Sequence, residues 1–297
     1  MIKSPEIAYL EKFTAMISSL DFAMPNEEFF ICHYTSASAL ESIFKKTYFR
    51  FTRWDFLNDE SEFVHIHEIV KSCLKEKMYS KKFKEQILSI NDIIEKLMGD
   101  ETYPSKENYY ILSFSANPDS LPMWSYYTKN KQSDGYNIEF DANVLMPFLK
   151  GNTNVETKLI KLIYKTNEKK RIVSDLLDNL HEMYVKLGDV PNRNDIVLLS
   201  FEVSIKMISK YFKHDAFEYE NEYRIIVEAP AEYEKVIEKD GVFVPYIELD
   251  FPKESVKCIN ISPTLSKRNP QIGLRTLLKN NGYDCNIIHS TIPFRNI

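Results

Sequence analysis

The sequence contains little glycine and no glycine-rich phosphate-binding motif. Only 7 of its 297 residues are Gly, and neither GxGxxG nor GxxxxGK[ST] occurs. Loops that cradle phosphates depend on glycine because the backbone itself must approach the phosphate closely. The composition therefore speaks against a nucleotide site of the Rossmann or P-loop kind.

Paired cysteines and long apolar runs are also missing. The four cysteines are Cys32, Cys73, Cys258 and Cys285. Because they lie far apart and form no CxxC pair, we expect reduced thiols in a cytoplasmic protein, and neither a disulfide framework nor a zinc ribbon. No apolar run approaches the ~20 residues that cross a bilayer, and charged side chains interrupt the N-terminal segment, so we expect no signal peptide and no membrane partner.

There is no excess of positive charge. Lys and Arg number 38 against 43 Asp and Glu, which gives a net charge of −5. An RNA- or DNA-processing enzyme would be expected to carry a basic stripe, and none is evident. Aromatic residues are abundant instead, with 19 Phe and 18 Tyr, while 44% apolar and 27% charged residues are ordinary for a globular protein.

Hydrophobic periodicity predicts an α+β fold. Strands are expected at 29–36, 47–52, 107–115, 135–141, 159–165, 219–228, 244–251, 256–262 and 284–290. Helices are expected at 5–20, 37–46, 60–98 with a break near Ser80, 123–127, 167–187, 195–212 and 269–281. Since no repeat or Gly/Ser/Pro linker divides the chain, we predict one domain over 1–297, with helical insertions at about 60–105 and 167–213.

The strand expected at 219–228 carries an unusual concentration of charge. Its alternation places one set of side chains on a polar face, namely Glu218, Glu220, Glu222 and Arg224. Neighbours on one face of a strand lie about 7 Å apart, so these carboxylates repel one another unless a cation opposes them. Such a field suits a site that stabilises a developing cation or keeps a carboxyl group protonated. The alternative is a half-buried strand that exposes its charges to water.

Two earlier strands carry polar residues at or near their ends. His33 lies in CHYT, and Ser113 and Ser115 lie in ILSFS. Each has a structural explanation, as a core imidazole or as hydroxyls packed in a strand. Taken in order with Glu220 and Glu222, however, they form the series His, Ser-x-Ser, Glu-x-Glu. This series resembles the three-part signature of ADP-ribosyltransferases, although Phe114 stands where their Ser-Thr-Ser motif has a central Thr.

The chain as a whole also resembles a widespread, uncharacterised bacterial family. The shared hallmarks are HYT (33–35), LND (57–59) followed by Glu62, SFS (113–115), MW (123–124), ENEYR (220–224) and S-x-I-P-x-R (290–295). Both resemblances together imply an ADP-ribosyltransferase-like fold with mixed and antiparallel sheets, and NAD+ as the substrate.

The transferase resemblance assigns roles to individual residues. Glu222 would stabilise the oxocarbenium-like cation formed when the nicotinamide–ribose bond breaks, and Glu220 would orient or deprotonate the acceptor. The dinucleotide would be held by residues of the first two motifs and by an aromatic side chain. Those assigned to NAD+ binding are His33, Tyr34, Thr35, Ser113, Ser115 and Trp124. The aromatic residue beside nicotinamide could be Tyr34, Tyr48, Trp124 or Tyr127, and a Trp next to Met123 is otherwise expected in the core.

Other polar residues have less specific interpretations. Asn58, Asp59 and Glu62 fit a helix cap, or alternatively the acceptor side of a cleft. Arg224 is expected to pair with a carboxylate, and Arg295 could contact a phosphate. His65 and His67 point about 200° apart on a helix, so we expect no metal site there and no metal cofactor. Cys32 precedes His33 on a strand, so the two face opposite sides and do not form a Cys–His catalytic pair.

Two kinds of function follow. One is an NAD+-dependent ADP-ribosyltransferase that modifies a protein or nucleic-acid acceptor, with NAD+ hydrolysis as a variant. Such proteins in bacteria are commonly toxins or antiphage effectors, which implies a possible antitoxin or inhibitor partner. The other is a non-catalytic binding or regulatory module on the same fold.

Overall fold

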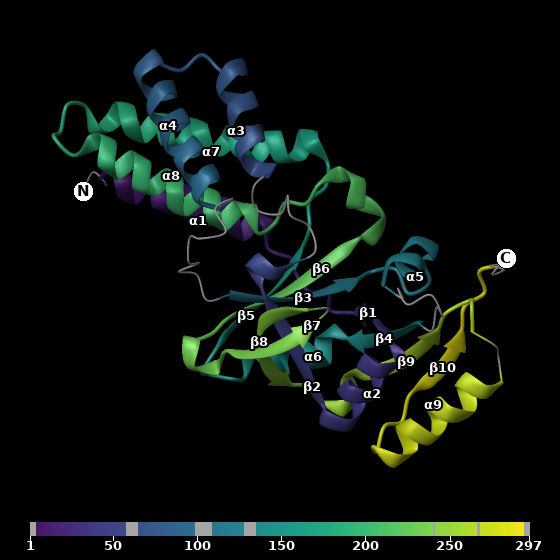
Figure 1. Cartoon of the computed structure of the whole chain (residues 1–297). Coiled ribbons are helices and arrows are strands. Elements are labelled where there is room, and N and C mark those ends of the chain that lie inside the picture. The colour runs from purple at the N-terminus through teal and green to yellow at the C-terminus, as the bar shows by residue number, and fades with distance from the viewer. Residues whose placement is uncertain are drawn as a thin grey trace. The chain divides into compact units, whose positions relative to one another are not determined.

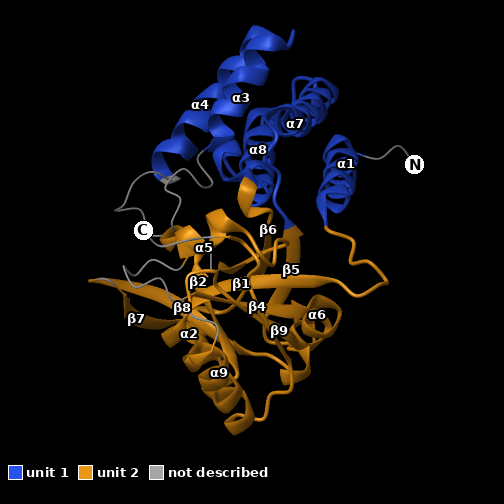
Figure 2. Ribbon diagram, turned by 90° about the vertical axis from the view of Figure 1, so that its right-hand side faces the viewer, with its two compact units in different colours: residues 1–21, 58–106, 161–218 blue, residues 22–57, 107–160, 219–297 orange. Residues whose placement is uncertain are grey.

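The chain forms two compact units, each assembled from three separate segments. Unit 1 contains residues 1–21, 58–106 and 161–218, and unit 2 contains 22–57, 107–160 and 219–297 (Figure 2). A computed structural model describes residues 4–57, 65–98, 109–127, 135–239, 241–265 and 268–293. Asn58, Asp59, Glu62 and Arg295 lie outside the described residues.

Unit 1 is helical. Its helices are α1 (Pro5–Leu20), α3 (His65–Glu76), α4 (Lys81–Met98), α7 (Thr166–Leu187) and α8 (Arg193–Ser209) (Figure 1). The two predicted insertions fall within this unit together with α1. Tyr9, Phe13 and Ile17, spaced four residues apart on α1, are buried, as helical periodicity predicts for a core-facing stripe.

In the residues that the structure describes, unit 2 is built on one ten-stranded mixed sheet. Its strands are β1 (Phe30–Ser36), β2 (Tyr48–Arg53), β3 (Tyr109–Ser115), β4 (Gly135–Asp141), β5 (Glu156–Lys161), β6 (Glu222–Glu228), β7 (Lys235–Lys239), β8 (Val242–Asp250), β9 (Val256–Ile261) and β10 (Asn286–His289). The order is β10-β9-β4-β1-β3-β2-β8-β7, while β6 pairs with β3 and β5. Only β10 and β9 pair in parallel among the described ladders. The α+β prediction is confirmed.

The sheet forks along one edge of β3. At one end Ser115 pairs with Cys32 of β1, and at the other end Tyr110 and Ile111 pair with β2. The opposite edge of β3 pairs with β6 along its whole length. Strands β1 and β2 therefore diverge from β3, and α2 (Ala37–Lys46) connects them.

The two branches of the fork pack against each other. Phe49 of β2 lies 5.0 Å from Phe140 of β4 and 5.9 Å from Phe114 of β3, measured between ring centroids. All three belong to one large buried cluster, which also includes side chains of α2, α6 (Ala142–Lys150) and α9 (Asn269–Asn280). This cluster defines the inner face of the sheet. Side chains that alternate with it point to the outer face.

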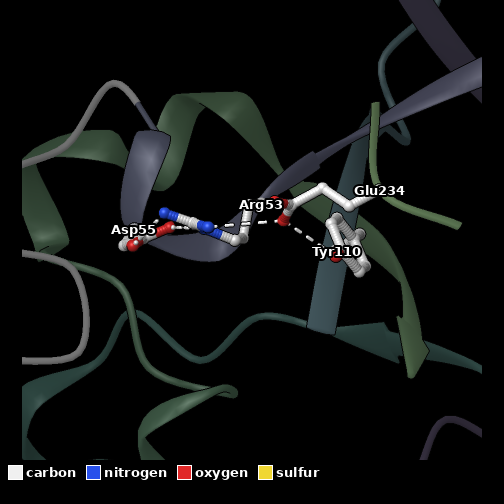
Figure 3. Close-up of polar contacts among 4 residues, drawn as sticks. All are labelled: Arg53, Asp55, Tyr110 and Glu234. Carbon is white, nitrogen blue, oxygen red and sulfur yellow. Dashed lines mark hydrogen bonds and ion pairs between the residues drawn. The ribbon is translucent and has the colours of Figure 1, made fainter. Parts of the chain in front are cut away.

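A polar cluster holds the end of β2 in place. Arg53 donates from Nε to Asp55 Oδ1 at 2.7 Å and from Nη1 to Glu234 Oε2 at 3.3 Å (Figure 3). Tyr110 of β3 donates its hydroxyl to the same Glu234 oxygen at 3.0 Å. The cluster thus joins β2, β3 and the segment that leads into β7.

Some elements differ from the sequence predictions. The helix α6 was not expected, although Ala142, Leu145, Met146 and Leu149 follow helical spacing and are all buried; Pro147 inside it weakens the helical signal. The edge strand β7 was also not expected, since it is largely exposed and lacks apolar alternation. The fifth strand covers Glu156–Lys161 instead of 159–165.

The remaining general expectations concern thiols and membranes. All four cysteines are free, in agreement with the sequence analysis. Within the described part of the chain, no helix is both long and apolar enough to cross a bilayer.

Candidate functional site

The Ser-x-Ser and Glu-x-Glu segments meet because β3 and β6 pair in register. Ser113 lies opposite Arg224, and Ser115 lies opposite Glu222. Directly opposed residues of an antiparallel pair share one face, and the inner face is occupied here by Phe114 and Tyr223. The two serines, Glu222 and Arg224 therefore lie together on the outer face of the sheet.

Glu220 reaches the same region by a different route. Residues Asp215–Glu220 form a 3₁₀ helix, and Asn221 has a left-handed backbone with φ of 42°. Ser115 Oγ donates to the Glu220 carbonyl at 2.6 Å, and Ala116 N donates to the Asn221 carbonyl at 3.0 Å. The predicted alternation from Glu218 onward is thus wrong before Glu222, because a strained turn replaces the strand. Glu218 is exposed.

The two glutamates of the motif are not solvated. Relative exposure is 4% for Glu220 and 3% for Glu222, so a charged face open to water is excluded. Arg224, itself 1% exposed, donates from Nε to Glu222 Oε1 at 2.8 Å and from Nη2 to Oε2 at 3.4 Å. The expectation that Arg224 pairs with a carboxylate is confirmed. A buried carboxylate needs such a partner because desolvation alone costs several kcal/mol.

Tyr127, at the end of α5 (Leu121–Tyr127), contacts Glu220 and is affected by the charge of Glu222. Its hydroxyl donates to Glu220 Oε1 at 3.2 Å. Burial raises the pKa of Tyr127 well above its ordinary value, and the nearby charges of Glu220 and then Glu222 raise it further. The phenol therefore remains a proton donor, and both carboxylates lie close enough to act on it.

An aromatic cluster adjoins these groups on the outer face. The rings of Tyr34 and Trp124 meet edge to face with centroids 4.7 Å apart, and Cys32 and Met123 are buried with them. Tyr127 packs against this cluster and so links it to the carboxylates. Trp124 is buried, as expected for a core Trp.

A short loop after β3 anchors the aromatic cluster. Tyr34 donates its hydroxyl to the Asn117 carbonyl at 2.7 Å, and Trp124 donates from Nε1 to Asp119 Oδ1 at 2.7 Å. Neither Asn117 nor Asp119 belongs to the motifs from which the site was predicted. The available signal was their position around Pro118, directly after the S-x-S strand, where Asn and Asp commonly form side-chain-stabilised turns.

The structure does not place His33 and Thr35 with Glu222. On β1 the buried Ile31 belongs to the inner core, while Cys32 and Tyr34 belong to the outer aromatic cluster. By alternation, His33 and Thr35 lie on the inner face. His33 Nδ1 lies 3.1 Å from the Ser113 carbonyl, and its ring lies 5.7 Å from Phe114.

At this point β1 diverges from β3, and the His33 imidazole, in place of a β1 backbone group, meets the Ser113 carbonyl. Burial lowers the pKa of His33 below its ordinary value of 6.5, so the ring is neutral near pH 7 and Nδ1 donates to the carbonyl of Ser113. Of the motif residues, the structure thus brings together Ser113, Ser115 and the two glutamates, and it places Tyr34 and Trp124 beside them.

The other histidines of interest belong to unit 1. His65 and His67 lie on α3, as the helical prediction requires, and contact different neighbours: His65 Nε2 lies 3.2 Å from Lys169 Nζ, and His67 Nδ1 lies 2.8 Å from Asn91 Oδ1. Tyr48 of β2 lies opposite Asp250, and its ring faces Lys46 and Arg50.

Part of the chain matches a known family. Residues 123–225 match DUF2971, a family described as a protein of unknown function. The matched segment begins at Met123 of the MW hallmark and ends one residue after the ENEYR hallmark, so it includes Trp124, Tyr127 and both buried glutamates. Neither a curated protein nor a solved structure matches the chain.

Proposed function

We propose that the protein breaks the nicotinamide–ribose bond of NAD+ and transfers ADP-ribose to a macromolecular acceptor. The observation that carries the proposal is the pairing of β3 with β6, which sets Ser115 opposite Glu222, directly after the turn whose Glu220 accepts a hydrogen bond from the Tyr127 hydroxyl. This is the juxtaposition that the resemblance of the motifs to ADP-ribosyltransferases implies. With both carboxylates ionised, Glu220, Glu222 and Arg224 together carry a formal charge of −1.

The chemistry uses this charge directly. When the bond between ribose C1′ and the nicotinamide nitrogen breaks, nicotinamide leaves with the bonding electron pair and the ribose becomes an oxocarbenium-like cation. Glu222 stabilises the cation electrostatically. The nucleophilic atom of the acceptor then attacks C1′, and Glu220 takes the proton that the acceptor loses.

The aromatic residue beside nicotinamide is assigned to Tyr127. Among Tyr34, Tyr48, Trp124 and Tyr127, only this side chain is both part-exposed and in contact with a glutamate of the motif among the described contacts. Tyr34 and Trp124 form a buried pair, and Tyr127 packs against their cluster. Ser113 and Ser115 fix the strand that carries the site, and no glycine-rich loop is required.

The pairing of Glu222 with Arg224 favours a second candidate, a non-catalytic module. A glutamate that only neutralises a buried arginine serves stability, and the fold would then present a binding surface without chemistry. The two candidates differ in what happens when Glu222 loses its charge but keeps its shape and a hydrogen-bond acceptor.

The test is nicotinamide release from NAD+ by the purified protein, compared with Glu222→Gln and, as a matched control, the exposed Glu218→Gln. We expect release by the wild type and by Glu218→Gln, and a loss of at least about 100-fold in Glu222→Gln, measured at a temperature where circular dichroism shows this variant to be folded, because Arg224 left without its carboxylate lowers the stability. Equal release by all three would remove Glu222 from the mechanism. No release together with no NAD+ binding by calorimetry would leave the binding module.

The biological setting follows from the same resemblance. We place the activity in the cytoplasm, as a toxin or antiphage effector whose acceptor is a protein or nucleic acid, with an inhibitor partner to restrain it. Expression of the wild type should slow bacterial growth, whereas expression of folded Glu222→Gln should not. Equal growth defects from the wild type and Glu222→Gln would show that any toxicity does not depend on the Glu222 carboxylate.

A further inference from the structure

The helical unit contains an apolar groove between α1 and α8. The two helices lie side by side (Figure 1), and the Tyr9 hydroxyl meets the Ser204 hydroxyl at 2.5 Å. The groove measures about 390 Å³, and its apolar lining includes Leu10, Phe13, Ile17, Leu199, Val203 and Met207. It lies wholly within unit 1.

The exposed part of α8 forms a continuous apolar stripe. Leu199, Val203 and Met207 are spaced four residues apart and share one side of the helix. Leu199 is 62% exposed, Val203 49% and Met207 39%, while Leu10 on the facing side of the groove is 56% exposed. The opposite side of α8, including Phe201, packs into the core. An apolar stripe on the side of a helix that faces away from its own core is usually covered by another surface.

Under a two-fold axis, the charges beside the stripe on one copy would meet charges of opposite sign on the other copy. Glu202 and Lys206 border the stripe on the side away from α1, and within one helix they form an ion pair at 3.1 Å. An axis through Val203 that sets two copies of α8 antiparallel brings Leu199 against Met207 of the partner subunit. The same operation places Glu202 beside Lys206 of the partner subunit.

A second pair of charges obeys the same symmetry. Asp195 near the start of α8 comes level with Lys210 of the partner subunit, just past its end. A parallel arrangement would instead set each charge against its own copy, and like charges repel. The charge pattern therefore favours α8 of a second copy as the occupant of the groove, in the antiparallel direction.

We propose that this groove is a homodimer interface, in which α8 of a second copy lies antiparallel between α1 and α8. Each α8 then contacts both helices of the other copy, so the four helices form a bundle whose core contains the two Val203 side chains. The proposal does not depend on the catalytic one, because it concerns unit 1 alone.

The first test is sedimentation of the full chain over about 1–100 µM, the range in which a modest homodimer dissociates. We expect a dimer, and we expect Val203→Glu to raise the dissociation constant at least about 100-fold because two buried charges would meet at the axis. The matched control is Val185→Glu, at a 61% exposed position of α7 outside the groove. A monomeric wild type, or a folded Val203→Glu variant that still dimerises, would overturn the proposal.

The second test uses the charges and leaves the apolar stripe intact. Glu202→Lys and Lys206→Glu should each weaken the dimer, because each sets like charges across the axis. An equimolar mixture of the two variants should form a heterodimer more tightly than either forms a homodimer, by about 10-fold or more. Neither chain can regain its own i,i+4 pair, so recovery in the mixture reports contact between copies. Absence of recovery would contradict the antiparallel arrangement.

Discussion

The buried pair of Glu222 and Arg224 is the residue-scale feature on which the site depends. Removing one partner of such a pair leaves an uncompensated charge out of reach of water. We therefore expect Arg224→Met to lower the free energy of unfolding by about 3–5 kcal/mol. Urea denaturation monitored by circular dichroism measures this loss.

The double variant separates charge from packing. In Glu222→Gln/Arg224→Met no ionised group remains in the pair, so we expect it to be more stable than Arg224→Met alone. If instead the two changes add, the guanidinium contributes through packing, and the ion pair is not what holds the start of β6.

A second residue-scale prediction concerns acid stability. His67 is fully buried, and the Asn91 contact leaves its Nε2 without a hydrogen-bond partner among the described residues. Burial lowers the pKa of His67 below its ordinary value of 6.5. The unfolded chain thus binds a proton more readily than the folded protein, and the stability contributed by neutral His67 is present above pH 6.5 and lost as the pH falls through the folded pKa.

The measurement is the unfolding free energy at about pH 7.5 and about pH 5.5. His33 and His65, whose pKa values burial also lowers, contribute in the same direction. We expect wild-type stability to fall on acidification and to fall less in His67→Gln, because that variant lacks the buried imidazole that takes up a proton on unfolding. An identical pH slope for His67→Gln and wild type would contradict this assignment.

At the scale of elements, the turn before β6 sets the distance between the two glutamates. Asn221 has φ of 42°, a region that Asn and Gly adopt more readily than other residues. We expect Asn221→Ala to cost about 1 kcal/mol of stability and Asn221→Gly to cost less. Thermal unfolding measures both, and nicotinamide release should fall further in the Ala variant, since Glu220 would move relative to Glu222. Equal effects of the two substitutions would show that the turn is not strained.

The same turn shows how far the sequence could locate elements. Most helices and strands were predicted correctly because their apolar residues repeat with the period of the element, as in α1 and α2. The Glu218–Glu222 alternation also has the period of a strand, but it runs through a 3₁₀ turn. Only the pairing with β3 determines where β6 begins, and pairing is a property of the fold.

The candidate site could be predicted only in part, because strand pairing and the side of the sheet that each residue faces are properties of the fold. Motif order led to Ser115 and Glu222, and the structure sets them opposite each other. It also led to His33, whose neighbour Tyr34 is the side chain on the outer face. Alternation shows that these two residues point to opposite sides, but it does not show which side of the sheet faces the site. That depends on the inner core formed by distant strands.

At the scale of the whole molecule, segments of the two units alternate along the sequence, and each unit has its own core. Each unit uses three separate segments, so no linker marks the boundary, and a single domain was the natural prediction from sequence. The core of unit 1 contains Leu176 of α7, and the core of unit 2 contains Ile225 of β6; both side chains are fully buried. A cavity in either core should therefore weaken its own unit first.

The last prediction tests this division. Leu176→Ala and Ile225→Ala each remove a buried aliphatic side chain, at a cost of about 2–5 kcal/mol. Because Ile225 belongs to the buried cluster of unit 2 and α7 packs against α1, α3 and α8 of unit 1, hydrogen exchange should accelerate in α3, α4, α7 and α8 for the first variant and in β1, β3 and β6 for the second. Uniform acceleration in both variants would mean that the two cores unfold as one cooperative structure. Confinement would mean that the helical unit can vary while the strand pairing that sets Ser115 opposite Glu222 stays intact.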